Sequence, residues 1–396
     1  MNRTRISNSK AFLVLLGISL LLTLLGAWAA LRIESGGHIL TGMNNSVPWG
    51  VALTLATFLL VAASGTLNLA SLSSVFGREA YKPFASFSAL LALSLLAGGL
   101  FTLMLDLGRP KDVFLVLNHF NAASVFSLNI VIYAVFFLLV GLYWLLTIFT
   151  PQGRGTRVFG FAAFVWRIIL TTGSGCVFAV LAGRSALHSA LLPPLFIALS
   201  LSLGLAVSVI ALYKAGIASE RPFAALCQED TARGMGNLLA ILVAVTFYMA
   251  ATLHLVGLNS PPVRSFERFV LCSGGIFPVL LWGGFVTLGT LIPLILLLVP
   301  ALRAWSLRLP AAAGCVVLGS FALMYTLIIT PQVYPPEIFP GKIVEDVFYG
   351  TPATYEATAL EWFVGLGGLG LAGLLSLFGM RVLPVLPNRF QPTSSQ

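Results

Sequence analysis

Long apolar runs dominate this sequence. Ten of them have membrane-spanning length and are separated by short polar breaks, at residues 11–31, 49–75, 84–105, 125–149, 158–182, 191–213, 235–258, 272–300, 311–330 and 361–385. A helix needs about 20 residues to cross a hydrocarbon layer roughly 30 Å thick. Charged residues make up only 9% of the chain, against about 25% in soluble domains. The sequence therefore predicts an all-α integral membrane protein with one polytopic domain, residues 1–396.

The first run raises the question of a signal peptide. Ala27-Trp28-Ala29 follows a basic tail and an apolar stretch, an order that resembles a signal-peptide cleavage site. The apolar stretch is long for a signal peptide, and we expect it to remain as the first helix.

Basic residues predict the orientation. An even number of spans leaves both tails, residues 1–10 and 386–396, on one side of the membrane. Lys and Arg are twice as frequent on that side as in the opposite loops. The positive-inside rule then predicts cytoplasmic termini in a cell inner membrane. The net charge of +9 follows mainly from this bias. No basic run is interleaved with exposed aromatic residues, so we expect no nucleic-acid partner.

Cysteine and histidine usage argues against a redox metal in this chain. The cysteines form no C-x-x-C pair and are scattered, at Cys176, Cys227, Cys272 and Cys315. Iron–sulfur clusters need closely grouped thiolates, so we expect none. Among the four histidines only His254 falls within a run. Paired axial ligands for a haem are therefore not expected either, and we predict no metal site.

Polar side chains gather in loops that the helix alternation places on the outer side. The stretch LMLDLGRPKDVF ends the third run with Asp106 and Arg109, and His119 follows in the same loop. We expect these three residues to do the chemistry. Further candidates for binding lie in this and the neighbouring outer loops: His38, Asn44, Asn45, Trp49, Asn121, Ser124, Arg184 and His188.

Polar groups that converge above an apolar bundle suit an amphipathic ligand. A quinone fits, because its reduction moves two electrons and two protons and needs a relay to water. Asp and His side chains can serve as such a relay, and Trp49 would form an aromatic wall. An interfacial loop explains the same residues without a ligand, if Asp106 pairs with Arg109 and the Asn and Ser side chains cap the next helix. Both interpretations stay open at this point.

Two other features invite a function. Arg167 is the only charged residue well inside a run. A charged side chain is costly in lipid, so we expect that of Arg167 to face protein or water. It is either a structural anchor or part of a polar path from the inner side. The connection TPQVYPPEIFPGKIVEDVFYGTPATYEATALEW is the longest, and its acids include Glu337, Glu356 and Glu361. A connection of this length often has a function, and we expect it to dock an outer partner protein.

An ordered set of motifs along nearly the whole chain resembles the NrfD/PsrC family of polysulfide-reductase membrane subunits. PWG opens the second run, LDLGRP ends the third, and NAASVFSLN stands in place of the family's N-x-x-S-x-x-S-x-x pattern. FAVLAGRSALHSALLPPLF resembles the segment before the sixth span. YPPEIFPG, followed by EWFVGLGGLGLAGLLSLFGMRVLPVLP, resembles the ten-helix branch, above all DsrP of the Dsr sulfite-reduction-associated complex.

The resemblance implies two four-helix bundles with an added helix at each end, and a bound menaquinone or ubiquinone near the outer face. It implies an extracytoplasmic ferredoxin-like iron–sulfur subunit, a cytochrome c subunit and further membrane and cytoplasmic redox subunits as partners. Carried over by motif, the site region includes Asp106, Arg109, Asn121, Ser124, Ser127 and Trp49.

The chain departs from the family at the proton-handling position. Some members carry a quinone-contacting histidine directly after the tryptophan, where this chain has Gly50. Ten-helix relatives can carry a histidine in the fifth span, where this chain reads TTGSG. The substitutes that the sequence offers are Asp106, His38, His119 and His188.

The leading hypothesis is a quinone-reactive membrane subunit of a respiratory sulfur-metabolism complex. A secondary transporter is the first alternative, but such proteins tend to place polar groups on interrupted helices at mid-membrane, where only Arg167 qualifies clearly. The second alternative is a passive anchor that holds redox subunits without binding quinone.

Overall fold

The computed structural model describes residues 3–107, 118–181, 187–302, 306–336 and 351–387. Its main helices are α1 (Lys10–Gly36), α2 (Val51–Thr66), α4 (Ala85–Asp106), α6 (Val125–Phe149), α7 (Arg154–Ala179), α8 (Leu192–Ala218), α10 (Glu229–Asn259), α14 (Arg308–Val333) and α15 (Ala359–Val382). Shorter elements are α3 (Asn68–Ser74), α9 (Phe223–Leu226), α11 (Arg264–Arg268), α12 (Ile276–Pro278), α13 (Ile292–Leu298), η1 (His38–Leu40), η2 (Glu79–Phe84), η4 (Phe269–Ser273), η5 (Val279–Leu291), η6 (Pro300–Leu302), β1 (Arg3–Thr4) and β2 (Leu386–Pro387).

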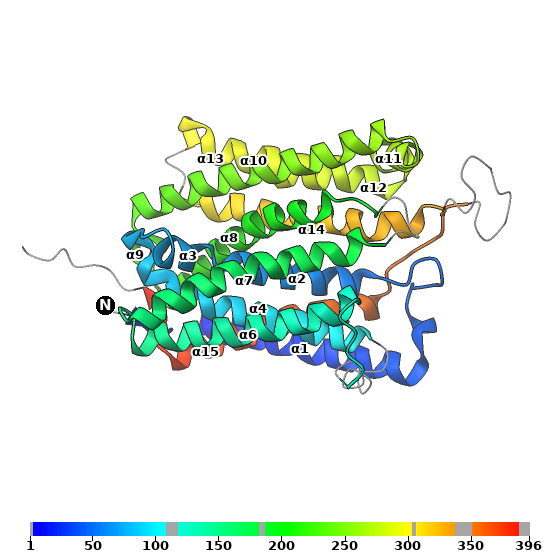
Figure 1. The fold of residues 1–396 in the computed structure, drawn as a ribbon. Coiled ribbons are helices and arrows are strands. Elements are labelled where there is room, and N and C mark those ends of the chain that lie inside the picture. The colour runs from blue at the N-terminus through cyan, green and yellow to red at the C-terminus, as the bar shows by residue number, and fades with distance from the viewer. Residues whose placement is uncertain (1–2, 108–117, 182–186, 303–305, 337–350, 388–396) are drawn as a thin grey trace, which may run out of the picture.

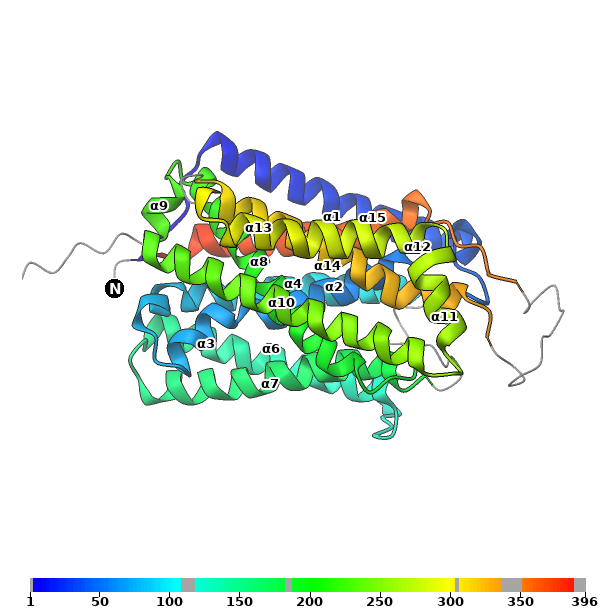
Figure 2. The ribbon, with the colours of Figure 1, turned by 90° about the horizontal axis from the view of Figure 1, so that it is seen from above.

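Ten helical segments of the described chain are long and apolar enough to cross a membrane, which confirms the predicted fold class. The second span consists of α2 and α3, and the eighth of α12, η5 and α13. The first four-helix bundle contains α2, α4, α6 and α7. The second contains α8, α10, the η5–α13 span and α14. The terminal helices α1 and α15 pack along each other and against α4 (Figures 1 and 2). This is the predicted arrangement of two bundles with a helix at each end.

Glycine brings the two bundles into backbone contact. Gly65 of α2 lies against Ser200 and Gly204 of α8, so closely that a Cβ on either glycine would overlap backbone atoms of the other helix. Small residues allow helices to approach in this way in lipid, where van der Waals packing drives association. The α2–α8 contact is therefore a tightly packed interface between the two bundles.

The helix ends form two faces. At one end, which we call the terminal face, β1 pairs with β2, with Thr4 opposite Leu386. At the other end, the distal face, α4 and α14 end and α2 and α15 begin. The described ends of the chain thus lie together, as an even number of spans requires.

Arg167 lies buried in α7, where it connects three helices. Its Nη1 donates to Asn68 Oδ1 at 2.8 Å, and the guanidinium lies 5.0 Å from the centre of the Phe164 ring. Asn68 in turn donates to the Leu201 carbonyl of α8 at 2.7 Å. These contacts make Arg167 a link between α3, α7 and α8, which is the anchoring role considered from the sequence.

Candidate functional site

Trp49 lies at the distal face directly before α2, between the two bundles. Its backbone N–H donates to Gln332 Oε1 at 2.9 Å, and Gln332 Nε2 donates to its carbonyl at 3.1 Å. Its indole ring meets Phe126 of α6 and Phe178 of α7, with ring centres 6.4 and 5.7 Å away. The second bundle therefore fixes the backbone of Trp49, while the first bundle surrounds its ring.

Glu361 ties the distal loops together. Its side chain belongs to the first turn of α15, a position that the helix dipole favours for an acid, and only 1% of the residue is exposed. One carboxyl oxygen accepts a hydrogen bond from the Gly42 N–H, and the other accepts one from the Tyr355 hydroxyl. That hydroxyl also accepts from the Val51 N–H at 2.7 Å. Two parts of the chain that are distant in sequence, residues 42–51 and 355–361, thus meet at one carboxyl group.

Gly50 leaves the space that this network fills. A Cβ at Gly50 would lie 2.5 Å from Glu361 Oε2 and 2.7 Å from the Tyr355 hydroxyl. Any side chain after Trp49 would displace one of these groups. The glycine, which departs from the family pattern, is thus explained by the residues that occupy the adjacent space.

Asp106 belongs to the same site. It is the last residue of α4, it is half-buried, and its carboxyl interacts electrostatically with that of Glu361. Arg109, its expected partner, lies outside the described residues. Burial, followed by the hydrogen bond to Glu361, raises the pKa of Tyr355 well above its ordinary value. The Tyr355 hydroxyl therefore keeps its proton at neutral pH and remains a donor to the carboxyl.

The other predicted binding residues that the structure describes lie at the distal face. Arg184 is outside the described residues, and those exposed to the surroundings are His38, Asn44, Asn45, His119, Asn121 and His188. Asn44 holds its own turn, because Oδ1 accepts from the Ser46 and Val47 N–H groups at 2.9 Å, and its Nδ2 donates to the Thr354 carbonyl.

The segment before α6 likewise shows the capping role considered from the sequence. Asn121 Oδ1 accepts from the Ala123 N–H at 2.9 Å. Ser124 caps α6 by accepting from the N–H of the buried Ser127 at 3.4 Å. These hydrogen bonds shape the entry to α6, next to the Phe126 ring that meets Trp49.

Sequence reasoning missed Glu361, Tyr355 and Gln332. It grouped Glu361 with the acids of a long docking loop, whereas the structure turns this side chain inward. One signal was available: an acid that opens an apolar helix is costly in lipid unless it is buried in protein. The hydrogen bonds of Gln332 and Tyr355 depend on loop conformation and had no sequence signal.

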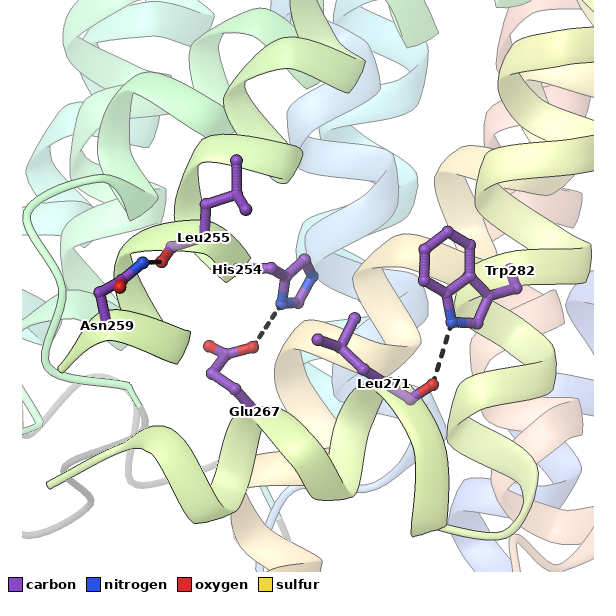
Figure 3. A network of polar contacts seen from close by, with 6 residues as sticks. All are labelled: His254, Leu255, Asn259, Glu267, Leu271 and Trp282. Carbon is purple, nitrogen blue, oxygen red and sulfur yellow. Dashed lines mark hydrogen bonds and ion pairs between the residues drawn. The ribbon is translucent and has the colours of Figure 1, made fainter. Parts of the chain in front are cut away.

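A second polar cluster lies at the distal end of the second bundle (Figure 3). His254 Nδ1 and Glu267 Oε2 form a mostly buried hydrogen bond at 2.7 Å, which ties α11 to α10. Nearby, Trp282 Nε1 donates to the Leu271 carbonyl at 3.0 Å. Aromatic packing joins this cluster to α14, because the ring centre of Phe266, next to Glu267, lies 5.5 Å from that of Tyr334 at the end of α14.

Two hollows of the described chain lie away from Trp49, Asp106 and Glu361. One, of about 240 Å³, is polar and lies at the terminal face, with Lys82 and Tyr143 in its wall. The other is a groove of about 460 Å³ along the distal part of α10, beside Leu255 and Asn259. Within the described ranges, no three His, Cys, Asp or Glu side chains are grouped so that they could hold a metal ion.

Comparison with known proteins gives the family. The model of the polysulphide reductase NrfD family matches residues 39–336. The chain is 27% identical over 357 residues to the "Hdr-like menaquinol oxidoreductase integral membrane subunit" of Archaeoglobus fulgidus, with 88% of each chain covered. It is also 27% identical to a putative membrane subunit of a dimethyl sulfoxide reductase from Halobacterium salinarum, over 93% of this chain and 90% of the relative. The chain therefore belongs to the polysulphide reductase NrfD family of membrane proteins.

Proposed function

We propose that this protein is the quinone-reactive membrane subunit of a redox complex. The observation that carries the proposal is the buried carboxyl of Glu361 directly behind Gly50, next to the aromatic cluster of Trp49, with Asp106 in electrostatic interaction with it. The relative named as a menaquinol oxidoreductase subunit supports the class of substrate. Menaquinone or ubiquinone is the substrate that we infer.

The chemistry follows from what these side chains can do. Oxidation of a quinol breaks two O–H bonds and releases two protons and two electrons. Trp49 would pack against the ring, and the Asp106 carboxylate would take up a proton at a carboxyl oxygen and pass it on to water. The electrons would leave to a redox subunit, because we infer no metal centre in this chain. In the reverse direction the same carboxyl would donate the proton.

The partners and the setting are finer parts of the proposal. We infer an extracytoplasmic ferredoxin-like iron–sulfur subunit at the distal face, with a cytochrome c subunit and further membrane and cytoplasmic redox subunits. The motif resemblance to DsrP supports a role in sulfur metabolism. The excess of Lys and Arg at the terminal face supports a cytoplasmic location for the termini, in the inner membrane.

Cys272 allows the orientation to be tested. It is exposed on η4 at the distal face, whereas burial raises the pKa of Cys227, on the terminal side, to about 12. In a variant that keeps only Cys272, we expect a membrane-impermeant maleimide to label intact cells. A cysteine-free variant with the exposed Asp230 replaced by cysteine should be labelled only after lysis. The reverse pattern would place the distal face in the cytoplasm.

Asp106→Asn tests the function. General acid–base groups contribute about 10²–10⁴-fold to rate, and we therefore expect quinol-dependent electron transfer by the purified complex to fall at least about 100-fold. Glu34→Gln is the matched control, because Glu34 is an exposed acid at the distal end of α1, and the activity of this variant should stay unchanged.

Lipid extraction from the same preparations completes the test. We expect quinone to co-purify with the wild-type complex. If a stable Asp106→Asn complex transfers electrons at the wild-type rate, this carboxyl has no essential role. A complex that neither contains nor oxidises quinol would instead be held together by a passive anchor.

A further inference from the structure

Glu361 is a buried carboxyl without a cationic partner among the described residues. The ion pairs of this part of the chain join Lys82 to Glu79 and Arg233 to Glu229, and His254 is hydrogen-bonded to Glu267. Instead, Glu361 accepts hydrogen bonds from the Gly42 N–H and the Tyr355 hydroxyl. A charged carboxylate is costly to bury without a cation.

The position of Glu361 connects it to the substrate region. Its Oε2 fills the space where the residue after Trp49 would place a side chain, because a Cβ at Gly50 would lie 2.5 Å from this oxygen. The carboxyl therefore lies behind the loop that carries the aromatic wall. It also interacts electrostatically with Asp106, the last residue of α4.

We propose that Glu361 is the second proton-exchanging residue of this site, alongside Asp106. The inference rests on the proposed function. It is motivated by the two protons that each quinol releases when it is oxidised. Each quinol that is oxidised loses two protons while two electrons pass to the iron–sulfur partner. Two carboxylates can take up these protons, one O–H bond forming at each as the two O–H bonds of the quinol break. Two neighbouring acids accept protons in coupled steps, since like charges repel.

Tyr355 supplies the way out to the aqueous phase. Its hydroxyl donates to Glu361 Oε2 and accepts from the Val51 N–H, and its ring is only partly buried. Among the described residues, the titratable groups that interact electrostatically with Glu361 are Asp106 of α4, Tyr325 of α14 and Tyr355 itself. The Tyr355 hydroxyl donates to Glu361, so the proton taken up by Glu361 can move towards the surface through Tyr355.

The test uses Glu361→Gln in the whole complex. Glutamine can still accept from the Gly42 N–H, so we expect the fold and the quinone content to be retained. Turnover of quinol should fall about 100-fold, with KM changed less than about threefold, and the fall in rate towards acid pH should change shape. The redox-induced infrared difference spectrum should lose a band from a protonated carboxyl. Glu361→Asp should recover part of the rate, and Glu34→Gln is again the control.

The outcomes separate this inference from the proposed function. If Glu361→Gln keeps the wild-type rate, pH profile and infrared bands, while Asp106→Asn loses activity, the role of Glu361 is refuted and the quinone site stands. If the wild-type complex itself neither holds nor oxidises quinol, the proposed function fails first. Where Glu361→Gln lowers the unfolding temperature, Tyr355→Phe provides the second measurement, because it removes only the relay hydroxyl. A wild-type rate and pH profile in Tyr355→Phe would disprove proton transfer from Glu361 through Tyr355.

Discussion

Replacing Gly65 with leucine is expected to prevent the two bundles from assembling. A Cβ at this position already overlaps the Ser200 carbonyl, and Gly204 lies directly across the contact. Because both sides of the contact are helix backbone, no side-chain rotation can relieve the overlap. Overpacking usually costs about 1–3 kcal/mol, and we expect more than about 3 kcal/mol here. Detergent-solubilised Gly65→Leu should elute as aggregate, or unfold at a far lower temperature than the wild type.

Gly141→Leu is the matched control. Gly141 also lies within a spanning helix, α6, but nothing occupies the space within 4 Å of its Cβ position. A surface substitution of this kind changes stability by about 0.5 kcal/mol or less. Equal loss of folded protein in both variants would show that leucine itself disturbs insertion. Wild-type stability of Gly65→Leu would disprove the close α2–α8 contact.

Asn68→Leu is expected to produce the second large effect. The change keeps the size of the side chain but removes the acceptor for Arg167 and the donor to the Leu201 carbonyl. Removal of one partner from a buried charged interaction leaves the other uncompensated, at a cost of about 3 kcal/mol or more. The midpoint of thermal unfolding in detergent should fall accordingly.

The double variant Asn68→Leu/Arg167→Leu distinguishes charge from packing. Without the buried guanidinium there is no unpaired charge, so we expect the double variant to be more stable than Asn68→Leu alone. A double-mutant cycle gives the coupling between the two residues. If the losses in free energy of unfolding of the two single variants add up in the double variant, Asn68 acts through packing and not through Arg167.

The fold was predictable because hydropathy and length decide which segments can cross a bilayer. Helix bounds were harder, since helices continue past their apolar part into the polar interface. The seventh run, 235–258, becomes Glu229–Asn259 in the structure for this reason. The eighth run, expected from residue 272, begins its span at Ile276, after the left-handed Gly275. The π-helical turns of η5 that follow have no sequence signal of their own.

The candidate site was predictable only in part. Trp49 and Asp106 stood out because they lie in motifs and at the ends of apolar runs. Glu361 did not, because a linear sequence assigns it to the preceding acidic loop and cannot show that Gly50 leaves room for its carboxyl. The histidines stood out because their chemistry is visible in a sequence, whereas their exposure at the distal face is not, and their role stays a prediction. The side chains that form this site, such as Glu361, are held by hydrogen bonds to residues from distant parts of the chain, and a linear sequence does not show such contacts.

The way in which Trp49 is held has a mechanical consequence. Gln332 of the second bundle fixes the backbone of Trp49, while Phe126 and Phe178 of the first bundle surround its ring. If the first bundle shifted slightly relative to the second, the orientation of the indole ring relative to its own backbone would therefore change. A protein that docks on one half alone could in this way reorient an aromatic ring held by the other.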